Sequence, residues 1–143
     1  MGENKVNGRK RQCWVDTHGC LRRVRVHPAD ISDTEGAEWR LAAHHHSFPR
    51  MHEIRAGEGY KQGLDAWMQQ NTAIRLNVIE QPPGQTGCAV IPKRWVVERS
   101  MAWAGRHRLA RNADTRNPES SEAFLYLGSI AMLLNRLYPS VSF

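Results

Sequence analysis

The stretch "RQCWVDTHGCLRRVRVHP", from Arg11 to Pro28, decides how the N-terminal part of the chain folds. Residues that favour strands stand on both sides of a turn-forming cluster at positions 16–19, and valines alternate with arginines after it. A period of two is typical of a strand with one buried face. The stretch therefore predicts a β-hairpin over residues 12–27, with Asp16 serving the turn.

A helical pattern follows the hairpin. Ser32 and Glu35 have the spacing of a capping box, in which a hydroxyl and a carboxylate close the first turn of a helix. This predicts a helix over residues 32–46. We expect its buried face to carry Ala37, Leu41 and Ala42.

A strand, a helix and a second strand are predicted within residues 52–81. The helix is indicated by Leu64, Trp67 and Met68, which lie at i, i+3 and i+4 on one face. The second strand is indicated by the alternation of apolar and polar residues over 74–78, before two prolines end it.

The predicted order is strand, strand, helix, strand, helix, strand, which indicates an α/β fold with a mixed sheet and covering helices. Two further helices are predicted over residues 92–108 and 119–138. Apolar residues surround nearly the whole of the last one, so we expect it to be buried on several sides. Because 143 residues suffice for one domain with a real core, we expect a single domain over residues 1–143.

Composition bounds the function. Lysine and arginine outnumber aspartate and glutamate by 20 to 14, and the formal net charge of +6 favours a polyanionic partner such as nucleic acid. The three cysteines lack the spacing of a disulfide framework or a zinc ribbon, which fits a reducing cytoplasm. The longest apolar run is too short to span a bilayer, so we expect no membrane association and, with DNA as the partner, a place at the nucleoid.

One carboxylate, Glu98, lies within the basic, aromatic stretch "PKRWVVERSMAWAGRHR" at residues 92–108. The surrounding cations are Lys93, Arg94, Arg99, Arg106 and Arg108. One interpretation is an exposed i, i+4 pair between Arg94 and Glu98, worth a few tenths of a kcal/mol. The other is a metal-binding carboxylate whose cationic neighbours hold a nucleic-acid backbone. The residues alone leave both open.

Five segments carry a family resemblance. They are "GRKRQCWVDTHGCL", "VHPADISDTEGA", "AGEGY", "PKRWVVERSMAWAGRHRLARN" and "PESSEAFLYLGSIAMLLNRL". In this order they resemble bacterial insertion-sequence transposases of the DDE type, most of all the IS-five-like group. The resemblance runs from about Asn7 to Leu137, which is nearly the whole chain.

This resemblance implies an RNase H-like catalytic domain in which three carboxylates, Asp, Asp and Glu, hold two Mg²⁺ ions for cleavage and strand transfer at transposon ends. Such in-line displacements at phosphorus use two metals to stabilise the attacking and leaving oxygens together. Glu98 matches the third carboxylate, and so a metal ligand, while Arg94 matches a basic residue usually one turn before it. The implied partners are DNA, contacted mainly at its phosphates, and a second transposase protomer.

The chain departs from the family at "AGEGY", residues 56–60, where the family commonly reads Ala-Asp-Gly-Gly-Tyr. Gly57 occupies the position of the second Asp. Glu58 is adjacent, but successive strand residues point to opposite faces, so we expect it to point away from the metals. Because Mg²⁺ demands near-octahedral oxygen geometry, we expect this chain to bind it poorly.

The first Asp of the family lies on a strand before "KVNGRKR", and the sequence begins after that strand. In an RNase H-like sheet this strand is the shared neighbour of the hairpin and of the strand near residue 54. We therefore expect an RNase H-like fold without its first strand, in an N-terminally truncated and catalytically inactive transposase. The alternative is a non-catalytic basic module that binds DNA and interferes with an intact transposase.

Further candidates for DNA contact begin the hairpin. They are Arg9, Lys10 and Arg11, with solvated strand residues as the simpler alternative. We expect the tryptophans at 67, 95 and 103 to lie in the core rather than to stack on bases.

Overall fold

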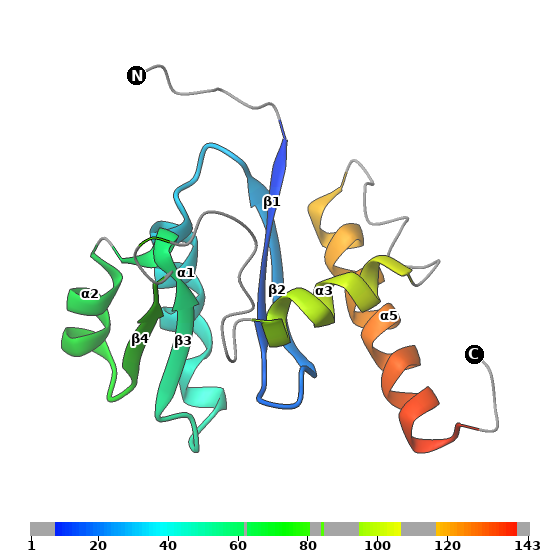
Figure 1. The fold of residues 1–143 in the computed structure, drawn as a ribbon. Coiled ribbons are helices and arrows are strands. Elements are labelled where there is room, and N and C mark those ends of the chain that lie inside the picture. The colour runs from blue at the N-terminus through cyan, green and yellow to red at the C-terminus, as the bar shows by residue number, and fades with distance from the viewer. Residues whose placement is uncertain (1–7, 62, 81–83, 85–94, 107–116, 140–143) are drawn as a thin grey trace. The chain divides into compact units, whose positions relative to one another are not determined.

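The computed structural model describes residues 8–61, 63–80, 84, 95–106 and 117–139, and these form an α/β fold (Figure 1). The α/β class is confirmed, and the architecture is consistent with an RNase H-like fold. Antiparallel and parallel pairing both occur, but the described residues hold them in two two-stranded sheets rather than in one mixed sheet. The prediction of one mixed sheet therefore differs from the structure, because in the described residues no strand of the hairpin pairs with β3 or β4.

The chain divides into two compact units. One comprises residues 1–8 and 29–94, and the other comprises residues 9–28 and 95–143. Each unit is described by itself below, and the single domain predicted from the length of the chain stays a prediction.

The hairpin forms where the sequence predicts it. Strand β1, Arg9–Val15, pairs antiparallel with β2, Leu21–Pro28. Asp16 ties the turn between them, because its Oδ1 accepts hydrogen bonds from the backbone N–H groups of His18 and Cys20, each at 2.9 Å. This matches the turn role predicted for Asp16.

Helix α3, Trp95–Arg106, docks on this turn. The Oγ of Ser100, a buried residue, donates a hydrogen bond to the carbonyl oxygen of Gly19 at 2.7 Å. Gly19 has a φ of +81°, and a Cβ at this position would lie 2.8 Å from the same Oγ. Only glycine adopts this φ without strain and leaves room for Ser100 Oγ, so the conformation of the turn and the position of α3 depend on each other.

Helix α5, Pro118–Leu137, covers β2 in the same unit (Figure 1). Two of its side chains accept hydrogen bonds from the strand's backbone. Tyr126 Oη accepts from the N–H of Val24 at 3.0 Å, and Glu122 Oε1 accepts from the N–H of Val26 at 2.8 Å. The helix therefore satisfies backbone donors that a further strand would otherwise pair.

Burial of α5 is one-sided, which differs from the burial on several sides that its composition predicted. Leu125 packs into the cluster formed with the valines of β2. In contrast, Leu127, Ile130 and Leu137 are 48%, 52% and 71% exposed. The physical reason is that a two-stranded hairpin offers a single small surface, so it covers only one face of a helix.

In the other unit, β3, Glu53–Gly57, pairs in parallel with β4, Arg75–Ile79. Helix α2, Leu64–Asn71, forms the connection between these strands and packs on β4. Leu64 and Met68 are buried, as their helical spacing predicts. Strand, helix and strand thus lie within the predicted span of 52–81.

Helix α1, Asp33–His44, lies within the predicted span and packs on α2. The predicted cap is confirmed, because Ser32 Oγ accepts a hydrogen bond from the N–H of Glu35 at 3.1 Å. Leu41 is buried as expected, but Ala42 is exposed. Adjacent helical residues point about 100° apart, and the buried stripe turns toward residues 36, 37 and 40 instead.

Two short 3-10 helices complete the described elements: η1, His45–Ser47, after α1, and η2, Glu58–Tyr60, after β3. In the ranges that the structure describes, every helix is too short or too polar to cross a membrane.

Candidate active site and nucleic-acid interface

Glu98 lies in the first turn of α3 and is exposed. The side of this helix that faces the hairpin turn carries Val96, Arg99 and Ser100, which lie nearest to Gly19. Glu98 projects from the opposite side, because it is two residues, or about 200°, away from Ser100. The docking of α3 thus turns this carboxylate toward solvent within its unit.

Gly57 is the last residue of β3. Its φ of −75° and ψ of 173° are ordinary extended values that any residue adopts. A Cβ built at this position would have no heavy atom of the described residues within 4 Å. Neither the backbone nor the packing therefore requires glycine here, and an aspartate would fit.

Glu58 follows Gly57 and begins η2, so the chain leaves the strand conformation at this point. Its side chain is exposed. The hydrogen bond and the charge of Glu80 raise the pKa of Lys61, and the charge of Glu58 adds a smaller effect in the same direction. The charge of Glu58 thus acts on a lysine of its own unit.

The basic residues of β1 are divided by the alternation of the strand. Arg9 and Arg11 are exposed and project from one face of the strand, while Lys10 projects from the other and is half-buried. On β2, Arg22 pairs with Asp16 at 2.8 Å. The hairpin therefore brings these cations close in space without gathering them on one face.

Trp103 differs from the core residue that the sequence predicted. It is half-buried, and two guanidinium groups lie over its ring, that of Arg99 at 4.6 Å from the centroid and that of Arg136 at 4.8 Å. Arg136 also donates to Cys20 Sγ at 3.7 Å. The i, i+4 spacing of Arg99 and Trp103 was a sequence signal for part of this cluster, but Arg136 arrives only through the packing of α5.

Four predicted positions fall where the structure gives no description. Lys93, Arg94 and Arg108 lie outside the described residues, as does the side chain of Trp95. Arg106 ends α3 and is exposed.

Residues 2–134 match the family described as Transposase DDE domain. The chain belongs to this transposase family. Its members act on DNA in transposition and generally use a divalent metal. No curated protein and no solved structure matches the chain.

A transposase domain of this type needs several converging carboxylates to hold its metals. Within the described residues, no group of three or more His, Cys, Asp or Glu side chains is placed to hold a metal ion. Gly57, at the end of β3, has no side-chain oxygen that could serve as a ligand. The residues that the structure describes therefore do not fit the metal centre that the family implies.

Proposed function

We propose that this chain is a transposase domain of the IS-five-like group that contacts transposon DNA without cleaving it. The observation that carries the proposal is Gly57. Its backbone and surroundings would accept an aspartate, so the acid at the family's second position is lost without any structural requirement for glycine. Gly57 breaks the carboxylate triad whether or not an upstream strand supplies the first Asp.

Glu98 is the third carboxylate in this proposal. It stands exposed on the first turn of a helix whose other face is anchored by Ser100. A single retained carboxylate binds Mg²⁺ weakly, because the ion sheds water reluctantly and requires near-octahedral oxygen ligands. No cleavage step follows from these residues alone.

DNA contact is proposed to survive this loss. The net charge of +6 attracts a polyanion over the Debye length, and the exposed Arg9, Arg11 and Arg106 offer phosphate contacts. A protein that covers transposon ends without cutting them competes with an intact transposase. Interference is therefore the second candidate function, and it uses the same basic residues.

The test is a nicking assay on supercoiled DNA that carries the element's ends, with Mg²⁺ or Mn²⁺. We expect no metal-dependent nicking by the wild-type chain, and no difference from Glu98→Ala. Turnover by the wild type that Glu98→Ala abolishes would show that the site is active and that the proposal is wrong. Inhibition of an intact transposase by the wild-type chain in the same assay would support interference.

A further inference from the structure

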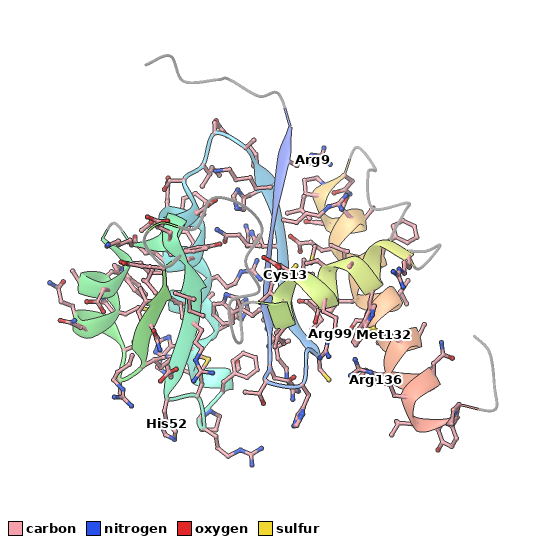
Figure 2. All side chains as sticks on the ribbon, viewed as in Figure 1. Arg9, Cys13, His52, Arg99, Met132 and Arg136 are labelled. Carbon is pink, nitrogen blue, oxygen red and sulfur yellow. The ribbon has the colours of Figure 1, made fainter. Side chains whose placement is uncertain are left out.

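Two arginines from different helices meet over one tryptophan in the hairpin unit. Trp103 belongs to α3. Of the two arginines, which Figure 2 labels, Arg99 belongs to α3 and Arg136 to the last turn of α5. Their guanidinium carbons lie 4.6 and 4.8 Å from the ring centroid. The two cations are therefore closer together than one Debye length, about 10 Å in 0.1 M salt, and they repel each other.

Most N–H donors of Arg136 have no strong acceptor among the described residues. Its guanidinium stacks on Trp103 and donates to Cys20 Sγ at 3.7 Å, and a sulfur atom is a weak acceptor. The residue is exposed, and among the described residues no carboxylate forms an ion pair with it. Arg22 on the same unit differs, because it is paired with Asp16.

Arg106 extends this cationic side of α3. It lies seven residues, or two turns, after Arg99, so the two residues project from nearly the same side of the helix. Arg106 is exposed. Positive charge thus continues from the cluster toward the end of α3.

We propose that Arg99 and Arg136, oriented by the Trp103 ring, form a phosphate-binding site for a DNA backbone at the junction of α3 and α5. A guanidinium presents donors in a planar fork that matches phosphate oxygens, and stacking fixes that plane in advance. A bound phosphate also relieves the repulsion between the two cations. This site rests on the DNA-binding function proposed above and adds Arg136 and Trp103 to it.

A purely structural role for Arg136 makes a different prediction. A cation in the last turn of a helix interacts favourably with the helix dipole, and its stacking joins α5 to α3. Loss of Arg136 would then lower the thermal stability and leave the salt dependence of DNA binding unchanged. Salt dependence is the readout that separates the two roles, because it counts phosphate contacts.

The experiment is fluorescence anisotropy with a labelled DNA duplex, without metal, at several salt concentrations between about 50 and 200 mM. The wild type is compared with Arg136→Gln and with Arg22→Gln, which removes the same charge from an arginine that is already paired. Thermal unfolding of each variant checks that it is folded. We expect Arg136→Gln to weaken binding by roughly threefold to tenfold and to reduce the slope of log K against log salt by about 1. Arg22→Gln keeps the wild-type slope.

Three results would overturn the site. Equal slopes for Arg136→Gln and the wild type, with or without a loss of stability, would leave Arg136 a structural residue. Equal effects of Arg136→Gln and Arg22→Gln on DNA affinity and on its salt slope would show that net charge alone explains the loss. A wild-type chain that fails to bind DNA even at the lowest salt would instead refute the DNA-binding function itself, and the site with it.

Discussion

Two glycines of this chain, Gly19 and Gly57, differ in whether the structure requires a glycine at their position. Gly19 has a positive φ, and a Cβ there would press on Ser100 Oγ, whereas Gly57 has an ordinary φ and no described residue close to the place of a Cβ. We predict that Gly57→Asp changes the free energy of unfolding by less than about 0.5 kcal/mol. Gly19→Ala is the contrasting variant. We expect its free energy of unfolding to fall by more than about 1 kcal/mol, because alanine is strained at a positive φ and its Cβ would press on Ser100 Oγ.

Urea unfolding of both variants checks this prediction. A large loss of stability for Gly57→Asp would show that position 57 requires glycine. The absence of a carboxylate would then have a structural cause rather than a functional one.

Asp16 gives the turn a dependence on pH. Burial would raise the pKa of its carboxyl, but hydrogen bonds from Cys20 and His18 and the charge of Arg22 outweigh burial and lower it below 3.8. A carboxyl whose pKa is lower in the folded state stabilises the fold above pH 3.8, and this contribution is lost as pH falls through the folded value.

Asp16→Asn keeps the acceptor oxygen and removes the charge, so it isolates this effect. We expect the wild type to be more stable than the variant near neutral pH, and the difference to shrink toward zero below pH 3.8. Unfolding curves at several pH values measure it. A difference that does not vary with pH would refute the assignment.

At the scale of elements, α5 stabilises the hairpin by direct bonds to its backbone. Tyr126→Phe removes the acceptor of the Val24 N–H, which belongs to a residue only 4% exposed. We predict a loss of about 1–3 kcal/mol in unfolding free energy, because a buried donor left without a partner loses its hydration as well. Tyr138→Phe, at a position 60% exposed just after the same helix, is the matched control and should change little. Similar losses for both variants would show that the hydrogen bond between the Val24 N–H and Tyr126 Oη does not account for the effect.

Local signals predicted most elements, and tertiary contacts account for what they missed. The hairpin turn at Asp16 and the cap at Ser32 depend on hydrogen bonds to residues at most four positions away, so both could be predicted from the local sequence. The exposed side of α5 could not be predicted from the sequence, because the apolar composition of a helix does not show how much surface the hairpin offers it. Arg136 contacts Cys20 across 116 positions, a separation that carries no local pattern.

The residues of the candidate site were selected from motifs, and their roles stay predictions. Motifs pointed to Glu98 and Gly57, whereas the space that the described residues leave around Gly57 is a property of the folded chain alone. Glu58 shows the limit of strand periodicity, because the strand ends at Gly57 and the alternation of faces ends with it.

At the scale of the whole molecule, we propose that the chain keeps basic residues for DNA contact while its set of catalytic carboxylates is incomplete. Charge acts over a Debye length and tolerates the loss of one residue, whereas a two-metal centre depends on each of its ligands. We therefore expect the proposed DNA binding to persist in this transposase domain without DNA cleavage. We predict that, in a chain that carries the family's Asp-bearing strand, position 57 decides whether DNA is cleaved.

The most direct measurement is DNA cleavage by a chain fused to the Asp-bearing upstream segment of an intact family member, with Gly57 either retained or changed by Gly57→Asp. We predict metal-dependent cleavage at the transposon ends only with Gly57→Asp, and its loss when Glu98→Ala is added. Equal cleavage by the fusion that retains Gly57 would contradict the account, because another group, such as Glu58, would then supply the second carboxylate.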